Sequence, residues 1–188
     1  MKRILVVGAG ALGSWTSEII VRSLNNLSFT LVDFDKIDEQ NIYRQLYYPE
    51  DIGKYKVEVL ANRLKKFGAN VKTVKSKIED VIDSLEDHDL ALALTDNIES
   101  RLVVEKRFKT LHAMVRPEFG ILLMTTEKVK LRNIMRRGRH RGRQDVSMVV
   151  TIASFAARAA IEYLTTGRSA VEGRMLIVSK YGTEWLEL

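Results

Sequence analysis

The chain has 188 residues, of which 46% are hydrophobic and 29% charged, a composition typical of one soluble globular domain with its own core. It contains no cysteine, which excludes disulfides, cysteine-ligated zinc, a thiolate nucleophile and any thioester formed within this chain. The formal net charge is +6, but the residues outside 128–143 comprise 22 basic and 24 acidic side chains, a net of −2, so the positive excess lies in one segment.

Short apolar runs alternate with helical patterns from the N-terminus onward. This alternation predicts an α/β fold, a Rossmann-like and mostly parallel sheet with helices on both faces. We expect strands at 3–7, 28–32, 71–74 and 90–94, and helices at 14–24, 53–67, 78–85 and 98–110.

The C-terminal half is expected to add some antiparallel strands to the same sheet. The pattern there predicts short strands at 121–126 and 128–131, a basic loop at about 133–147, a long apolar helix at 148–166 and a last strand at 175–179. No repeat or linker divides the chain, so we expect residues 1–188 to form a single domain.

Two apolar stretches resemble a signal peptide or a membrane-spanning helix. Met1-Lys2-Arg3 precedes a short apolar run, as in a signal peptide, but glycines interrupt the run in a spacing typical of a binding turn. The stretch 148–164 carries Arg158 and Glu162, which favours a buried helix over a membrane span. We therefore expect a cytoplasmic protein with no membrane contact.

Three glycines, Gly8, Gly10 and Gly13, lie between the first predicted strand and its helix. In this setting the first glycine permits a tight turn, the second lets backbone N–H groups approach a phosphate, and the third allows close helix–strand contact. Asp33 ends the next strand, where its carboxylate can accept hydrogen bonds from ribose hydroxyls. These features fit NAD, FAD or ATP equally, and they also fit a glycine turn that binds nothing.

Further polar motifs follow at fixed spacing. A DxD-x5-N-x2-RQ stretch runs from Asp33 to Gln45, a Gly-x-x-Lys start of a helix ends at Lys56, and a TDN-x3-R segment ends at Arg101. With the glycine motif these four elements, in this order, resemble the ThiF/MoeB/HesA family, the ancestral relatives of ubiquitin-activating enzymes. The resemblance runs from Lys2 to about Arg107, then thins until the late helix and last strand.

The residue types themselves suit a triphosphate. Arg44 offers a planar fork for two phosphate oxygens, and Lys56 is a point charge at the start of a helix. Asn41 can reach a phosphate or a metal-bound water, and Asp96 follows a parallel strand, where a lone carboxylate with phosphates commonly holds Mg²⁺. The alternatives stay open: Asn41 or Asp96 as helix N-caps, and Arg44 and Lys56 as surface charges.

The resemblance implies a role for each of these residues. Asp33 would bind the ribose, Asn41, Arg44, Gln45 and Lys56 would belong to the ATP site, and Asp96 would hold Mg²⁺. Arg44, Lys56 and Asp96 would be the catalytic set.

The resemblance also implies a reaction, the Mg·ATP-dependent adenylation of a carboxylate. The expected substrate is the C-terminus of a ubiquitin-like or sulfur-carrier protein, and the expected assembly is a homodimer or heterodimer. The chain departs from the family because it has no cysteines and begins at the first strand, without the N-terminal arginine that reaches the partner subunit's site. The alternatives are a partner-dependent nucleotide-binding module, adenylation of a modified tRNA nucleoside, and, least favoured, a nicotinamide oxidoreductase.

The segment from 128 to 143 carries eight basic residues and no acidic one: Lys128, Lys130, Arg132, Arg136, Arg137, Arg139, Arg141 and Arg143. It is either a solvated loop or a contact for an anionic partner, such as ATP phosphates, an acidic carrier or RNA. It lacks aromatic residues for base stacking, so contact with RNA would be to phosphates. His88, His112 and His140 are too scattered to predict a metal site.

Overall fold

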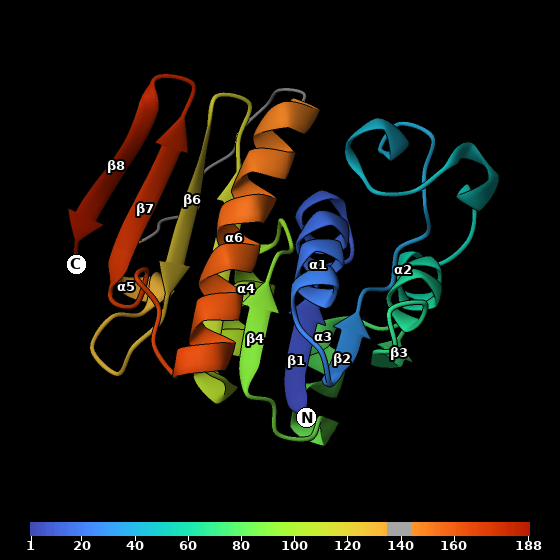
Figure 1. Ribbon diagram of the computed structural model, residues 1–188, viewed down its shortest axis with the longest axis horizontal. Helices are drawn as coiled ribbons and strands as arrows, with labels where there is room; N and C mark the ends of the chain where they lie inside the picture. Colours follow the sequence, from blue (N-terminus) through green and yellow to red (C-terminus); the bar gives the residue numbers. More distant parts are fainter. Residues whose placement is uncertain (135–143) are drawn as a thin grey trace.

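The computed structural model describes residues 1–134 and 144–188. Within these residues eight strands form one sheet in the order β3-β2-β1-β4-β5-β6-β7-β8 (Figure 1). The first five are parallel: β1 (Lys2–Val7), β2 (Leu27–Val32), β3 (Asn70–Val74), β4 (Leu90–Ala93) and β5 (Thr110–Val115). The last three pair antiparallel: β6 (Phe119–Met124), β7 (Arg174–Ser179) and β8 (Gly182–Glu187).

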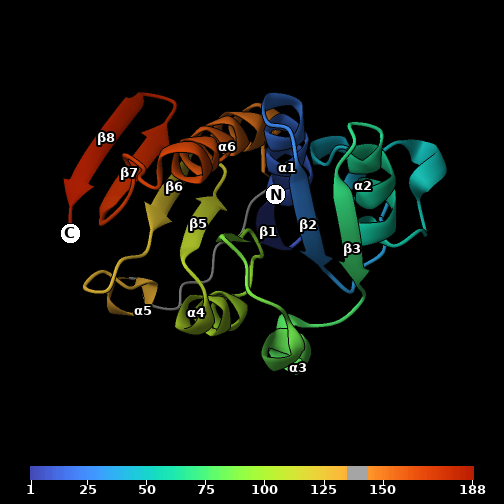
Figure 2. The same cartoon turned by 60° about the horizontal axis from the view of Figure 1, so that its bottom comes forward.

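Helices cover both faces of the sheet (Figure 2). One face carries α1 (Ala11–Ser23), α2 (Lys56–Lys65) and α6 (Val146–Thr166), and the other carries α3 (Ile78–Val81), α4 (Ile98–Arg107) and α5 (Leu131–Ile134). Short 3₁₀ turns lie at η1 (Ile42–Arg44), η2 (Pro49–Asp51) and η3 (Ile82–Ser84). The predicted fold class, a mostly parallel α/β sheet with antiparallel strands in the C-terminal half, is confirmed.

The central strands are apolar on both faces because both faces are covered. In β1, Ile4 and Val6 pack into the core beneath α1, α2 and α6, whereas Leu5 and Val7 pack into the core with α3 and α4. Strand β4 alternates in the same way between its leucines and its alanines. These two cores hold the carboxyl ends of β1, β2 and β4 in fixed positions.

The sheet order reverses at β1. From β1 the chain moves outward through β2 and β3, then returns to place β4 on the other side of β1. Parallel sheets bind ligands beyond the carboxyl ends of their strands at such a reversal. The glycine turn, Asp33 and Asp96 follow β1, β2 and β4, so this edge is where the predicted site residues gather.

Several predicted boundaries were wrong. The helix predicted to Thr110 ends at Arg107, and β5 follows. The predicted strand 128–131 is instead a turn followed by α5, in which the Thr126 N–H donates to the Val129 carbonyl and the Val129 N–H donates to the Thr126 hydroxyl oxygen. The helix expected at 53–67 begins at Lys56, and the one at 78–85 splits into α3 and η3.

By length and composition α6 is the described helix that is apolar enough to cross a membrane. In the fold it lies against α1 and the sheet, and its inner face is buried through Val149, Ile152 and a row of alanines. Its N-cap is Asp145 and it ends at Gly167, which has a φ of +77°. The prediction that this segment is a buried helix is thus confirmed for its inner face.

Candidate active site

The glycine turn joins β1 to α1. Gly8 has a φ of +95°, and a Cβ there would lie 2.8 Å from the backbone nitrogen of Thr95. A Cβ on Gly13 would lie 1.9 Å from the carbonyl oxygen of Gly8. Gly10 meets no such clash, because its nearest neighbour, Gln45 Nε2, is 3.8 Å from the Cβ position. Packing therefore requires Gly8 and Gly13, while the bare backbone at Gly10 leaves room for an approaching anion.

Asp33 closes over this turn from the end of β2. Its Oδ2 accepts a hydrogen bond from the Ala9 N–H at 2.7 Å, and its Oδ1 accepts one from the Asp35 N–H at 2.8 Å. Burial raises the pKa of the Asp33 carboxyl, and the nearby charge of Lys56 and these two N–H donors oppose the rise. The carboxylate is thus fixed in orientation beside the turn.

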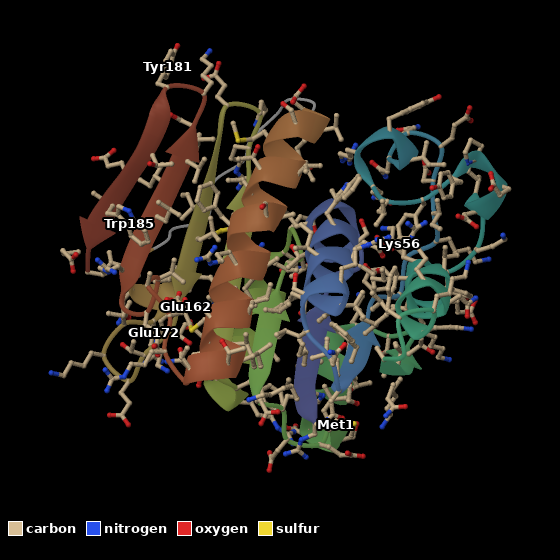
Figure 3. The ribbon with its side chains drawn as sticks, in the orientation of Figure 1. Met1, Lys56, Glu162, Glu172, Tyr181 and Trp185 are labelled. Atoms are coloured by element: carbon tan, nitrogen blue, oxygen red, sulfur yellow. The ribbon has the colours of Figure 1, made fainter. Side chains whose placement is uncertain are left out.

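Lys56 is the first residue of α2 (Figure 3). It is almost fully buried, with 8% of its side chain exposed. Its Nζ lies 2.6 Å from Oδ2 of Asp35, and its backbone N–H donates to the Asp35 carbonyl at 3.1 Å. Long charged side chains are buried only when they are paired. The alternative that Lys56 is a solvated surface charge is therefore wrong.

Arg44 lies at the end of η1, against the first turns of α1. Its guanidinium donates to Oδ1 of Asn41, and its carbonyl accepts from the Trp15 indole N–H at 3.2 Å. Two residues on, the Leu46 N–H donates to Oγ of Ser14 at 3.1 Å. Helix α1 therefore fixes η1 beside the glycine turn. Asn41 occupies the N-cap position of η1, as its capping alternative predicted, but its side chain binds Arg44 and makes no capping hydrogen bond.

Gln45 lies between these two anchors and is 7% exposed. Its Nε2 faces Gly10, while its Oε1 is buried without a hydrogen-bond partner. An amide donor thus faces the position where the glycine turn leaves space.

Asp96 lies in the loop between β4 and α4 and is exposed. The N-cap of α4 is Asn97, whose Oδ1 accepts from Glu99 N–H at 2.8 Å and Ser100 N–H at 3.4 Å. The alternative that Asp96 is the N-cap is therefore wrong. Its carboxylate is not committed to the helix terminus.

Arg101 holds the base of this loop. It is 3% exposed and donates to the carbonyls of Ala93, of Thr95 at 2.5 Å and of Ala113 at 2.8 Å. Burial lowers its pKa to about 9, with the charge of Asp96 opposing the shift. The arginine of the TDN-x3-R segment thus joins β4, β5 and the Asp96 loop.

The structure joins some of the sequence-predicted residues in pairs. Asp33 contacts the glycine turn, Gln45 faces Gly10, and the Lys56 charge acts on Asp33. Gly8 packs against Thr95, the neighbour of Asp96. No described hydrogen bond or ion pair joins Arg44, Lys56 and Asp96 directly, so their common role stays a prediction.

The remaining metal and charge predictions have different outcomes. Residues 1–134 and 144–188 contain no group of three or more His, Asp or Glu side chains placed to hold a metal ion. His88 bonds to Thr30 Oγ1 at 2.9 Å, and His112 lies apart from it on β5, next to Glu105. Arg136 to Arg143 and His140 lie outside the described residues, so the role predicted for the basic segment is untested.

The N-terminal part of the chain matches a known protein family. The model of the ThiF family matches residues 1–116, which is more than half of the chain. The chain belongs to the ThiF family.

Curated ThiF relatives are similar over the same N-terminal part. The probable molybdopterin-synthase adenylyltransferase of Gracilaria tenuistipitata var. liui is 31% identical over 110 residues, covering 55% of this chain and 30% of that protein. The molybdopterin-synthase adenylyltransferase of Escherichia coli (strain K12) is 32% identical, covering 53% of this chain and 41% of that protein. The sulfur carrier protein ThiS adenylyltransferase of Bacillus subtilis (strain 168) is 29% identical, covering 54% and 32%. The matches span less than half the length of these relatives.

Solved structures extend the likeness of fold to the whole chain. The crystal structure of E. coli MccB has a TM-score of 0.84 at 15% identity, covering 99% of this chain and 62% of that one. E. coli MccB crystallised with ATP has a TM-score of 0.80 at 17% identity, covering 100% and 63%. At this identity the likeness shows the fold alone, and it includes the antiparallel strands beyond the ThiF match.

Sequence reasoning missed Asp35, Ser14 and Trp15, which shape the site. Asp35 pairs with Lys56, and its place in the DxD stretch was the available signal. Ser14 and Trp15 fix the η1 segment from α1, but they carry no motif. Contacts across about thirty positions in the chain become visible only in the fold.

Proposed function

We propose that this chain binds Mg·ATP and adenylates a carboxylate, giving an acyl-adenylate and pyrophosphate. The observation that carries the proposal is that a glycine turn, an oriented carboxylate and a buried lysine lie together at one edge of the sheet. Asp33 is fixed beside the turn, and Lys56 enters from α2. The adenylyltransferase relatives, which match this part of the chain, support the same reaction.

Each residue has a defined task in the proposed reaction. Asp33 accepts hydrogen bonds from the ribose hydroxyls, and the N-terminus of α1 with Gln45 Nε2 faces the phosphates. Asn41, Arg44 and Lys56 neutralise the charge that develops when a substrate carboxylate oxygen attacks the α-phosphorus. The new O–P bond forms as the bond to the β,γ-pyrophosphate leaving group breaks. When phosphate oxygens approach Lys56, they replace Asp35 as its charged partner.

Mg²⁺ would be held by Asp96 together with phosphate oxygens. The donor fits, because this carboxylate is exposed, follows a parallel strand and is free of the capping role that Asn97 fills. When bound, the ion supplies charge neutralisation and orientation of the phosphates. Arg101 contributes by holding the loop that carries Asp96.

The proposed substrate is the C-terminal carboxylate of a sulfur-carrier or ubiquitin-like protein in the cytoplasm. Support comes from relatives named for sulfur carrier protein ThiS and for NEDD8 activation.

A second candidate function is a nucleotide-binding module that is active only with another subunit, identical or different. The chain spans only 62% of MccB and 22–41% of these curated relatives, so the activity of the whole enzymes is a proposal for this chain. The tRNA alternative rests on the basic segment, most of which lies outside the described residues.

ATP–pyrophosphate exchange tests this function. Wild-type protein mixed with Mg·ATP and carriers ending in Gly-Gly is expected to exchange labelled pyrophosphate only when a matching carrier is present. Asp96→Ala is expected to lower the exchange rate by about a hundredfold, the size of effect seen when one transition-state charge partner is lost. Asp87→Ala, an exposed carboxylate before β4 at the opposite end of the strand, serves as the matched control and keeps the wild-type rate.

The outcomes separate the two candidates. Exchange that appears only after a second subunit is added would favour the partner-dependent module. Exchange that is equal in Asp96→Ala and wild type would refute the catalytic assignment.

A further inference from the structure

Tyr47 is a buried tyrosine between η1 and η2 that none of the sequence motifs includes. It is 6% exposed, and its hydroxyl lies 2.5 Å from the Ala9 carbonyl oxygen and 3.3 Å from the Lys56 carbonyl oxygen. One phenol thus bridges the glycine turn and the first residue of α2. These two segments lie 47 positions apart in the chain and supply different halves of the proposed phosphate site.

The phenol completes a set of contacts that hold Ala9 and Lys56 from both sides. The Ala9 N–H donates to Asp33, while the Ala9 carbonyl accepts from Tyr47. The Lys56 N–H donates to the Asp35 carbonyl, while the Lys56 carbonyl faces the same phenol. Asp33 and Asp35 therefore fix one side of this pair of residues and Tyr47 fixes the other.

The chemistry of the phenol suits a permanent donor. Burial, followed by the nearby charge of Asp33, raises the pKa of Tyr47 well above its ordinary value, so the hydroxyl stays protonated at any pH at which the protein functions. A buried carbonyl that loses its donor is costly, because no water replaces the bond. The single O–H hydrogen is shared between the Ala9 carbonyl at 2.5 Å, its main acceptor, and the Lys56 carbonyl at 3.3 Å, so the phenol acts on the nucleotide only through the segments that it joins.

We propose that Tyr47 is a positioning residue that sets the distance between the glycine turn and Lys56, so that the two grip one triphosphate together. The effect on ATP binding rests on the proposed function, but the effect of the bridge on the two segments can be measured without nucleotide.

The test uses Tyr47→Phe, which keeps the ring in the core and removes only the bridging oxygen. In the nucleotide-free protein, hydrogen exchange is expected to quicken about tenfold at residues 9–12 and 55–58, because local opening no longer breaks that bond. Exchange in β4 and β6 is expected to stay at the wild-type rate. The Kd for Mg·ATP is expected to rise about fivefold to tenfold, since the phosphate site is no longer held in one geometry. Tyr48→Phe removes the same oxygen from the neighbouring exposed ring and serves as the control.

Three results would overturn the inference. If the hydrogen-exchange rates at residues 9–12 and 55–58 are the same in Tyr47→Phe as in the wild type, the bridge does not hold the two segments. Faster exchange throughout the sheet would show a general packing role. Local loosening with an unchanged Kd would show that the bridge does not serve the nucleotide. If the wild-type protein fails to bind Mg·ATP at all, the proposed function fails, and the exchange measurement alone still decides whether Tyr47 joins the two segments.

Discussion

At the scale of single residues, Asp33 shows how the fold prepares a side chain for a ligand. Its two oxygens are aimed by the N–H groups of Ala9 and Asp35, while burial makes its charged form more costly than in water. A carboxylate held in this way can accept hydrogen bonds from ribose hydroxyls without first being ordered. The same burial makes its charge sensitive to acid.

The affinity for Mg·ATP is therefore expected to depend on Asp33 in the acid range. The pKa of Asp33 is raised above 3.8, so the ionised form that accepts from the ribose is lost at a higher pH than for an ordinary aspartate. Affinity should weaken as the pH falls through that raised pKa and should level off above it. The measurement is the Kd by calorimetry from pH 7.5 down to the limit of folding, for wild type and Asp33→Asn.

The variant also serves as the control, because ATP itself titrates in this range and does so equally in both experiments. The ratio of the two Kd values is expected to be largest near pH 7.5 and to shrink toward low pH. A constant ratio would show that the charge of Asp33 plays no part in binding.

At the scale of elements, α5 depends on a buried carboxylate from α4. Glu105 accepts from the Leu131 N–H at 2.8 Å and the Arg132 N–H at 3.5 Å, and its Oε2 lies 3.4 Å from Nε2 of His112. Burial opposes ionisation of Glu105, but the contacts with His112 and the Leu131 N–H hold its pKa below the ordinary value. Burial also lowers the pKa of His112 below 6.5, with Glu105 opposing that shift, so at pH 7 the expected pair is a neutral imidazole beside a carboxylate.

This pair is expected to make the fold sensitive to acid. His112 has a folded pKa below 6.5, so stability falls as the pH drops through 6.5, where the unfolded chain takes up a proton first. Glu105, whose folded pKa is also lowered, adds a further loss below its unfolded value of 4.5. Urea unfolding of wild type and His112→Gln between pH 7.5 and 5 measures the first effect, and the variant should show a flatter dependence.

Glu105→Gln tests how much the carboxylate of Glu105 contributes to stability. It keeps one acceptor for the α5 N–H groups, and it is expected to lower the free energy of unfolding at pH 7 by about 1–3 kcal/mol, the usual cost of weakening a buried charged hydrogen bond. An equal pH slope in wild type and His112→Gln would mean that burial of this histidine is not linked to folding.

Short apolar runs that are bounded by turn residues were the elements that the sequence could predict. Strands β1, β2 and β4 are short apolar runs, and the glycine turn marks the start of α1. Strand β5 was missed because no glycine or proline separates it from α4. Strand β8 was missed because every residue in it is exposed, and it forms only by pairing with β7.

Some site residues could be predicted from the sequence and others could not. Asp33, Arg44, Lys56 and Asp96 sit in spaced motifs, so their positions along the chain were enough to select them. Trp15 and Tyr47 act through backbone carbonyls that lie far away in sequence. Such a bond leaves no pattern in residue type, since any carbonyl accepts from any donor.

At the scale of the whole molecule, the similarity in sequence to the ThiF family covers less of the chain than the similarity in fold to MccB. The family match ends at residue 116, near the end of β5, whereas the likeness to MccB continues through β8. The parallel half carries all of the proposed nucleotide contacts. The antiparallel half presents exposed apolar residues at its outer hairpin, including Tyr181 and Trp185 (Figure 3).

The central claim is that the glycine turn, Lys56 and Asp96 bind a triphosphate together, and ligand-dependent thermal unfolding tests it most directly. A ligand that binds only the folded state adds about 2.7 kcal/mol at a hundredfold excess over its Kd, which shifts Tm by several degrees. Mg·ATP is expected to raise the Tm of the wild type, NAD⁺ is expected not to, and Lys56→Ala and Asp96→Ala should each lose most of the rise. Stabilisation by NAD⁺ without any by Mg·ATP, or a Mg·ATP shift that survives in both variants, would contradict the claim.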